Sequence, residues 1–164
     1  MKSIQNIVKR CFDIEAQSIS PIASVEAALE KMEKNNSGAL TVMDFSHLVG
    51  IFSERDYVRK VLSKGRSSLA TPVYEVMNTN LISVSPEYRL TECLALMSAC
   101  NIRHLPVIRD ERLVALLGIE DIAFALIDNN EFMIGELTTY ITGSHEVKSD
   151  PPNLSKVFEG VLHS

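Results

Sequence analysis

The chain has 164 residues, 46% of them hydrophobic and 23% charged, which is enough to bury the core of one or two small globular domains. Its net charge of -5 argues against a nucleic-acid-binding protein, because such proteins neutralise phosphates with a basic face; a local arginine cluster can still bind a small anion. No apolar run approaches the roughly 18 residues of a membrane span, and the N-terminal residues lack a signal-peptide pattern. We therefore expect a cytoplasmic protein that binds neither nucleic acid nor a membrane.

The sequence contains an internal repeat. Sliding the chain by 65 positions aligns residues 17–57 with residues 82–122 without a gap. The residues that meet an identical residue 65 positions later are Ser18, Ser20, Pro21, Leu29, Met32, Asn36, Leu40, Val42, Leu48, Val49 and Asp56. Most of these residues are apolar and in phase, so the two segments arose by duplication.

The first repeat predicts a β-α-β-β-α unit. A short strand over 18–20 ends at a proline, and apolar residues then recur at i, i+3, i+4 and i+7 from Val25, as in an amphipathic helix. Two apolar runs within residues 39–52 predict a β-hairpin. A second helix over 54–64 ends at Gly65, a favourable C-terminal cap.

The second repeat predicts the same unit. Its strand covers 81–85, its first helix shows the same apolar spacing from Leu90, and its hairpin lies within residues 105–117. Its last helix, residues 119–128, is apolar on nearly every side. We expect that helix to be buried against its own sheet and against a partner subunit.

The repeats predict how the chain is divided. A single repeat of about 60 residues is small for independent stability, so the two should pack face to face as one module. Val73, Val76 and Met77 form a short apolar anchor between them. The expected segments are a lead-in helix over 1–17, repeat one over 18–70, the linker anchor with repeat two over 71–142, and a tail over 143–164.

Nothing in the sequence indicates catalysis. Cys11, Cys93 and Cys100 have no CxxC spacing, and we interpret them as reduced core residues. The chain has no P-loop, GxGxxG, HExxH or Gly-x-Ser-x-Gly motif, and its four histidines are scattered. We predict no metal site, no catalytic cofactor and no enzyme activity.

The segment GIFSERDY, residues 50–57, places a hydroxyl and a carboxylate where a buried strand becomes a helix. Ser53 and Asp56 have the spacing of a capping box, which satisfies the free backbone N–H groups of the helix. The free backbone N–H groups at the start of such a helix can also bind an anionic ligand. In the second repeat Gly118 replaces the serine while Asp121 keeps the carboxylate, which modestly favours a ligand role for both aspartates.

These motifs resemble those of the cystathionine-β-synthase (CBS) domain pair, or Bateman module, over about residues 8–130. The segments that carry the resemblance are GIFSERDY (50–57), TPVYEVM (71–77) and NIRHLPVI (101–108). The resemblance implies an α+β fold in which tandem β-α-β-β-α repeats pack about a pseudo-two-fold axis, commonly as a homodimer. It also implies a regulatory module for an adenosyl ligand: AMP, ADP, ATP, NAD(H) or S-adenosylmethionine.

The resemblance assigns a first cleft to Asp56, whose carboxylate would accept hydrogen bonds from the ribose hydroxyls. Phosphate contacts would come from Ser53 and Arg55 and, in the other repeat, from Arg103 and His104. Arg103 can also be read as a solvated surface residue, and His104 as a half-buried hairpin residue. Other residues implied to line this cleft are Ile51, Phe52, Ser85, Leu90, Ile102 and Pro106.

A second cleft would surround Asp121 and is expected to be empty, weaker or suited to an uncharged adenosyl group. It has neither an arginine nor a histidine where the first cleft has Arg103 and His104, and Glu120 replaces Arg55. The other residues implied there are Ser20, Val25, Ser37, Gly38 and Ala39.

Three functions remain open at this point. The first is a stand-alone sensor that binds a purine nucleotide and modulates a partner such as an enzyme or a transporter. The second is a structural dimerisation module with no physiological ligand. The third is a subunit of an enzyme whose catalytic chain is separate.

Overall fold

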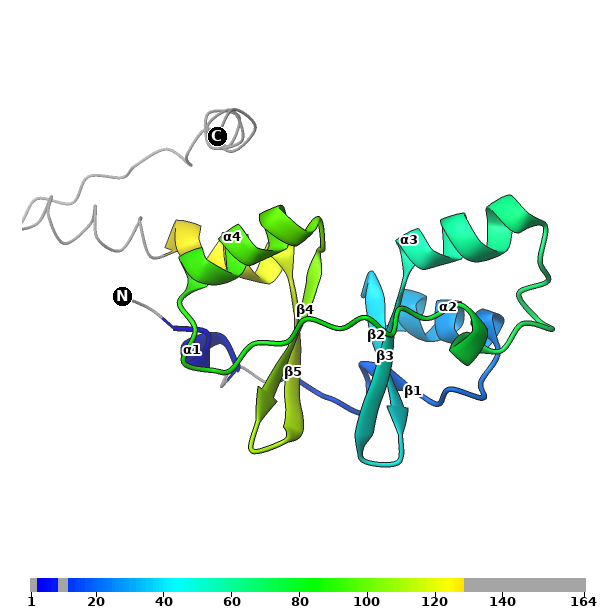
Figure 1. Cartoon of the computed structure of the whole chain (residues 1–164), viewed down its shortest axis with the longest axis horizontal. Coiled ribbons are helices and arrows are strands. Elements are labelled where there is room, and N and C mark those ends of the chain that lie inside the picture. The colour runs from blue at the N-terminus through cyan, green and yellow to red at the C-terminus, as the bar shows by residue number, and fades with distance from the viewer. Residues whose placement is uncertain (1–2, 9–11, 129–164) are drawn as a thin grey trace, which may run out of the picture. The chain divides into compact units, whose positions relative to one another are not determined.

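The computed structural model describes residues 3–8 and 12–128, which form two halves of similar architecture (Figure 1). The tail over 143–164, Cys11 and the part of the second segment beyond residue 128 lie outside the described residues. The mixed fold of small sheets and helices confirms the predicted α+β class and the β-α-β-β-α plan of the first repeat. The limits of the four expected segments remain predictions.

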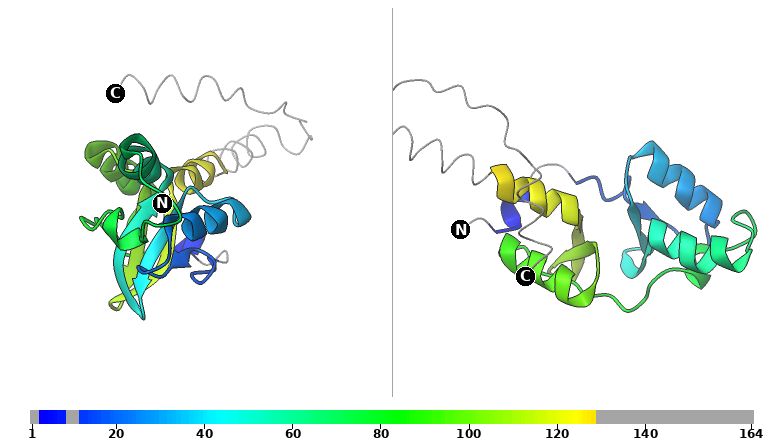
Figure 2. Two further views of the ribbon diagram at one scale, coloured as in Figure 1. Left: turned by 90° about the vertical axis from the view of Figure 1, so that its right-hand side faces the viewer. Right: turned by 90° about the horizontal axis from the view of Figure 1, so that it is seen from above.

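The first half contains a three-stranded sheet in the order β1-β2-β3. The strand β1 (Ser18–Ile19) runs parallel to β2 (Ala39–Asp44), and β2 pairs antiparallel with β3 (His47–Ser53). The helix α2 (Val25–Lys34) begins at Ser24, whose side chain accepts a hydrogen bond from the Ala27 N–H. The helix α2 lies beside this sheet (Figure 2). Leu40, Val42 and Phe52 cluster with residues of α2, so the sheet and the helix share one core.

The helix predicted over 54–64 forms with three kinds of turn. It begins as α3 (Glu54–Asp56), widens to a π-helix (Tyr57–Val61) and tightens to a 3-10 turn (Leu62–Lys64). Gly65 closes it with φ of 66°, as predicted for a left-handed cap. In the second half, residues 119–128 are regular α-helix. The wide turn therefore distinguishes the segment that follows Asp56 from the one that follows Asp121.

The second half has a two-stranded sheet of β4 (His104–Arg109) and β5 (Arg112–Gly118), with α4 (Leu90–Cys100) beside it. The prediction of a strand over 81–85 is wrong, because this segment forms only one parallel bridge, between Val84 and Val107. In the first half the Thr41 N–H donates to the Gln17 carbonyl and extends the pairing. The equivalent residue is Pro106, which has no N–H, so the strand loses that hydrogen bond.

The cysteine prediction is half right. Cys93 is fully buried in α4, and burial raises the pKa of its thiol to about 11, so this thiol stays protonated at neutral pH. Cys100 is exposed, contrary to the prediction. The reason is that α4 ends there, at Asn101, which caps it with a left-handed backbone (φ of 53°).

The core of each half includes residues from a segment of the chain that lies outside its own repeat. The helix α1 (Gln5–Val8) packs on the second half, where Ile4 is fully buried and its N–H donates to the Tyr88 carbonyl at 2.9 Å. The 3-10 turn Val73–Glu75 packs on the first half through Val73 and Val76. This confirms the apolar anchor, and the exchange ties the two repeats into one module.

A third apolar cluster joins the halves. Ala39, Ile51 and Leu116 are buried together, with Leu81 against them. Ile51 and Asn78 exchange two backbone hydrogen bonds of 3.0 and 2.8 Å, which fasten the linker to β3. Gly50 permits this close approach, since a Cβ there would lie 2.5 Å from the Met77 Sδ. The predicted face-to-face packing is therefore observed.

Candidate functional site

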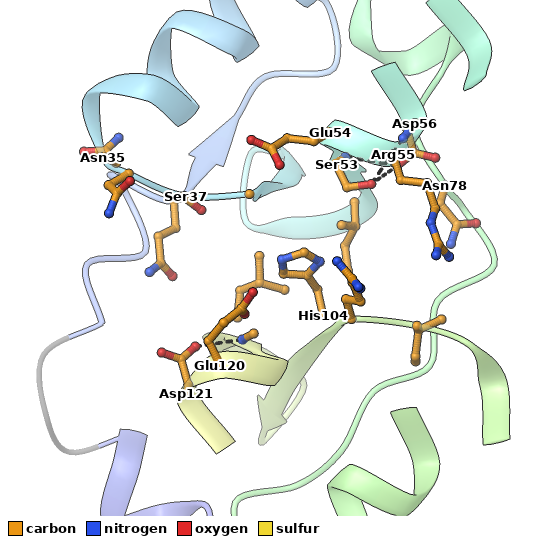
Figure 3. A pocket seen from close by; sticks show the side chains of 18 of the residues that line it. Asn35, Ser37, Ser53, Glu54, Arg55, Asp56, Asn78, His104, Glu120 and Asp121 are labelled. Atoms are coloured by element: carbon orange, nitrogen blue, oxygen red, sulfur yellow. Dashed lines mark hydrogen bonds between the residues drawn. The ribbon is translucent and has the colours of Figure 1, made fainter. Parts of the chain in front are cut away.

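A cavity of about 650 Å³ lies where the two halves meet, and both halves line it. It runs from Asp56 at one end to Asp121 at the other, with His104 between them (Figure 3). The sequence predicted two separate clefts, but the structure joins them in a single cavity. Its two ends are built from equivalent residues of the two repeats, and they differ in charge.

The Asp56 end contains the predicted capping box. The Ser53 Oγ accepts a hydrogen bond from the Asp56 N–H at 3.3 Å. The Ser53 N–H and hydroxyl both donate to the Asp56 Oδ2, at 3.0 and 2.8 Å. The Lys60 Nζ lies 2.9 Å from the other carboxylate oxygen. The Asp56 carboxylate is thus already held on both of its oxygens.

Two arginines bring positive charge to the Asp56 end. The Arg55 Nη1 donates to the Asn101 carbonyl at 3.2 Å, which orients this guanidinium across the boundary between the halves. Arg103 precedes β4, is exposed and lines the same cavity. The Asp56 carboxylate of one repeat and the Arg103 guanidinium of the other therefore line the same cavity.

The polar side chains at the Asp121 end are either acidic or carry no charge. The Asp121 Oδ2 accepts a 2.7 Å hydrogen bond from the Gly118 N–H, its one hydrogen bond within the described residues. Burial raises the pKa of the Asp121 carboxyl; the Gly118 N–H and His104 oppose this effect, and Glu120 adds to it. Opposite lie Asn35 and Ser37 (Figure 3). This end holds a less neutralised carboxylate than the Asp56 end does.

His104 stands between the two ends. Burial lowers the pKa of its imidazole, while the carboxylates of Glu120, Asp121 and Glu54 act in the opposite direction. Its ring lies against Gly38, since a Cβ on that glycine would be 3.7 Å from both the His104 Nε2 and the Glu54 Oε2. The imidazole is therefore placed to donate to a ligand group that reaches the centre of the cavity.

The structure brings most of the predicted side chains to this cavity. Those that line it are Ser37, Gly38, Ile51, Ser53, Arg55, Asp56, Ile102, Arg103, His104 and Asp121. Their roles in binding remain predictions, because a shared cavity does not identify a ligand.

Other predicted residues do not line the cavity. Leu90, Val25, Phe52 and Ala39 are core residues, because their positions in the helices and strands turn their side chains inward. Pro106 is buried within β4, and Ser20 is exposed just after β1. Ser85 is half-buried and also lies outside the lining.

Several lining residues were not predicted, among them Phe12, Gln17, Glu54, Asn78 and Phe124. One further pair had a signal in the sequence. Asn36 and Asn101 are identical in the two repeats, both adopt positive φ (49° and 53°), and both line the cavity. Asparagine tolerates this left-handed backbone, which turns the chain from each helix toward the following strand.

The comparisons with known proteins agree with this architecture. Residues 8–63 and 73–128 each match the CBS domain. The chain belongs to the CBS domain family. Two such domains make it a CBS pair, a regulatory module, and this confirms the resemblance seen in the sequence.

Three similar proteins illustrate the relationship. The CBS domain-containing protein CBSX3, mitochondrial, of Arabidopsis thaliana is 35% identical over 127 residues, which span 74% of this chain but only 62% of that protein. A CBS-domain protein from Burkholderia ambifaria is 30% identical with a TM-score of 0.69, over 90% of this chain and 100% of that one. The CBS pair of protein MJ0100, in complex with 5′-methylthioadenosine and S-adenosyl-L-methionine, is 26% identical with a TM-score of 0.61, over 66% and 89%.

Within residues 3–8 and 12–128, no helix is long and apolar enough to cross a membrane. In the same part of the chain, no three His, Cys, Asp or Glu side chains gather in a way that can hold a metal ion.

Proposed function

We propose that this CBS pair binds an adenosyl ligand in the cavity between its repeats and thereby regulates a partner without catalysing a reaction itself. The observation that carries the proposal is the shared cavity, which Asp56 of one repeat and Arg103 of the other both line. The adenosyl ligands of the similar MJ0100 pair support the ligand class. The proposed ligands are AMP, ADP, ATP, NAD(H) and S-adenosylmethionine.

The Asp56 end is the proposed place for a phosphorylated ligand. The Asp56 carboxylate accepts from the ribose hydroxyls, while Arg55, Arg103 and His104 donate to the phosphates, where charge-assisted hydrogen bonds are strong. The Ser53 hydroxyl now donates to the Asp56 Oδ2 at 2.8 Å. If that hydroxyl rotates toward a phosphate, the Asp56 Oδ2 keeps the hydrogen bond from the Ser53 N–H at 3.0 Å and has one lone pair free for a ribose hydroxyl.

Regulation requires that the ligand bind two states of the module with different affinity. The cavity is lined by both halves, and the Arg55 hydrogen bond to Asn101 crosses between them. A ligand that contacts both halves stabilises one arrangement of them over others. The regulated partner, an enzyme or a transporter, would respond to that arrangement.

The test is a thermal-shift and calorimetric titration with AMP, ADP, ATP, NADH and S-adenosylmethionine. A ligand present at a hundred times its dissociation constant should stabilise the fold by about 2.7 kcal/mol, which is a clear rise in melting temperature. Guanosine monophosphate serves as the control for non-specific phosphate binding. If no adenosyl compound changes the melting temperature, the proposal is wrong.

A second candidate function, homodimerisation without a ligand, has its own support. Val58 and Leu62 on the helix over 54–64, and Phe124 on the helix over 119–128, are large apolar side chains that are 52%, 59% and 71% exposed. Leu62→Glu should convert a dimer to a monomer in light scattering, with Lys64→Glu as the control on the same helix. A dimer that binds no adenosyl compound would favour the structural module.

A further inference from the structure

Lys60 connects the cavity to the linker between the repeats. Its Nζ lies 2.9 Å from the Asp56 Oδ1 and donates a hydrogen bond of 2.9 Å to the Val76 carbonyl. Asp56 lines the cavity, whereas Lys60 is not among the lining residues. The Asp56 side chain is 15% exposed and that of Lys60 is 42% exposed, so water screens their contact only in part. One ammonium thus holds both a carboxylate of the proposed ligand site and a backbone group of the linker.

Val76 is the residue at which the linker leaves the core of the first half. Its side chain is 1% exposed, whereas residues 78–80 are exposed. The Met77 and Asn78 N–H groups both donate to backbone carbonyls, that of Asn78 to the Ile51 carbonyl at 2.8 Å. The lysine contact therefore fastens the linker at its last buried residue, just before the chain continues into the second repeat.

The second repeat lacks the side chain that makes this contact. The position 65 residues after Lys60 is Ala125, whose methyl group cannot bind a carboxylate. Correspondingly, Asp121 accepts only the Gly118 N–H within the described residues. Lys60 also lies on the π-helix Tyr57–Val61, and such wide turns occur frequently at functional sites. The repeats therefore differ not only in the charges of the cavity but also in how an aspartate is joined to the rest of the fold.

We propose that Lys60 is a positioning residue that couples ligand binding at Asp56 to the closure of the linker over residues 76–80. The Asp56 Oδ1 accepts from Lys60 and, as a carboxylate oxygen, has a second lone pair for a ribose hydroxyl. A ligand bound there fixes the carboxylate, the carboxylate fixes the ammonium, and the ammonium holds the Val76 carbonyl. Because coupling is reciprocal, a ligand that keeps the linker closed binds more weakly where the linker opens freely. This ligand-dependent part rests on the proposed function.

The first test needs no ligand. Amide hydrogen exchange of the free protein reports linker opening through the Met77 and Asn78 N–H groups, which are hydrogen-bonded in the closed form. Lys60→Met removes the ammonium but keeps an unbranched side chain. It should make both amides exchange about three- to tenfold faster, as one partly exposed charge-assisted hydrogen bond allows. Asp56→Ala should also speed both amides, and combining it with Lys60→Met should add less than about twofold, because both changes break the same chain of contacts.

The second test adds saturating AMP or adenosine. Either compound should slow exchange of the Met77 and Asn78 amides about five- to tenfold in the wild type, within the usual range of coupling between sites, and less than about twofold in Lys60→Met. Adenosine is included because the proposed coupling runs through the ribose and not through a phosphate. In calorimetry, Lys60→Met should weaken AMP by about the same five- to tenfold, although Lys60 does not line the cavity.

Two variants serve as controls. Lys64→Met makes the same chemical change at an exposed position of the same helix, and it should leave the exchange rates and the AMP affinity at their wild-type values. Lys60→Arg keeps a cation that can donate to both acceptors, so it should retain at least about half of the ligand-dependent slowing. Exchange in α4, which belongs to the second half, is the internal reference.

The outcomes separate this inference from the proposed function. If Lys60→Met exchanges the two linker amides at the wild-type rate, the inference is refuted whether or not a ligand binds. Slowing by AMP but not by adenosine also refutes it, since Lys60 then responds to the phosphate. Faster exchange in Lys60→Met with the ligand effect unchanged shows a purely structural lysine and refutes the coupling. If no nucleoside or nucleotide binds the wild type, the proposed function fails, and with it the coupling to a ligand; the first test then still decides whether Lys60 fastens the linker.

Discussion

The two ends of the cavity share one backbone plan but differ in the charges placed on it. The Gly38 carbonyl accepts the Glu54 N–H at 3.1 Å, and the equivalent Arg103 carbonyl accepts the Ile119 N–H at 2.9 Å. Duplication therefore preserved the hydrogen bonds that shape each end, while the side chains diverged. One such divergent pair is Gly38 in the first repeat and Arg103 in the second.

The aspartates show the same divergence. Asp56 is held by Ser53 and Lys60, whereas Asp121 has only the Gly118 N–H within the described residues. Asp121 is therefore the less satisfied acceptor, even though the arginines proposed to bind phosphate lie at the Asp56 end. The structure shows two ends of unlike charge in one cavity; we predict that they bind ligands differently, and four experiments test this prediction.

The largest expected effect is on nucleotide binding after removal of the Asp56 carboxylate. Each hydrogen bond to a charged acceptor contributes about 1.5–3 kcal/mol, so Asp56→Ala should weaken AMP at least tenfold in calorimetry. Asp121→Ala should weaken AMP much less, and Asp44→Ala, on the exposed hairpin, should have no effect. Equal losses at Asp56 and Asp121 would show that the ends are equivalent.

Removing the Arg103 guanidinium should weaken the binding of a phosphorylated nucleoside but not that of the nucleoside alone. Arg103→Ala should weaken AMP about tenfold but leave adenosine unchanged, because only AMP offers the charged partner. Arg112→Ala, an exposed arginine on β5, is the matched control. Losses of the same size for AMP and adenosine would mean that Arg103 does not contact phosphate.

Transferring the arginine should make the ends more alike. Gly38→Arg places a guanidinium at the position equivalent to Arg103, and the space beside Gly38 permits a Cβ at ordinary contact distance. We expect AMP binding that depends on Asp121 to strengthen about three- to tenfold, as one exposed charge-assisted contact allows. Gly38→Ala controls for the loss of glycine. No gain would mean that more than this one charge separates the ends.

The smallest effect is on the pH dependence of stability. Burial lowers the pKa of His104 below its usual 6.5, so the unfolded chain binds more protons just below that pH. The melting temperature should therefore fall as the pH is lowered from 7 to about 5, and His104→Gln should reduce that fall. Asp121 acts oppositely, since its raised pKa costs stability as the pH rises above 3.8. A wild-type profile unaffected by His104→Gln would contradict this assignment.

Much of the fold could be predicted because the repeat shows each element twice. Apolar spacing located α2 and α4, and the paired runs located both hairpins. No strand forms near Val84, because Pro106 on the neighbouring strand has no N–H to donate. Which residue lies opposite this segment is set by the tertiary structure, and a local sequence pattern does not show it. The exposure of Cys100 depended on where α4 ends, and the limits of helices are the least predictable part of a pattern.

The site could be predicted only as far as the repeat and the family resemblance reach. The repeat and the resemblance both identified Asp56, and the resemblance alone identified Arg103 and His104; all three line one cavity. Gln17 and Glu54 belong to no motif, so their place in the cavity follows from packing between the repeats. The contacts that hold Asp56 also required the structure, since Lys60 lies on the wide turn after it.

The most direct measurement is a crystal structure of the chain with AMP. The account predicts that the ribose hydroxyls lie within hydrogen-bond distance of the Asp56 carboxylate and that the phosphate contacts Arg103 from the other repeat. AMP bound outside the cavity, or bound with its phosphate directed toward Glu120 and Asp121, would contradict the account.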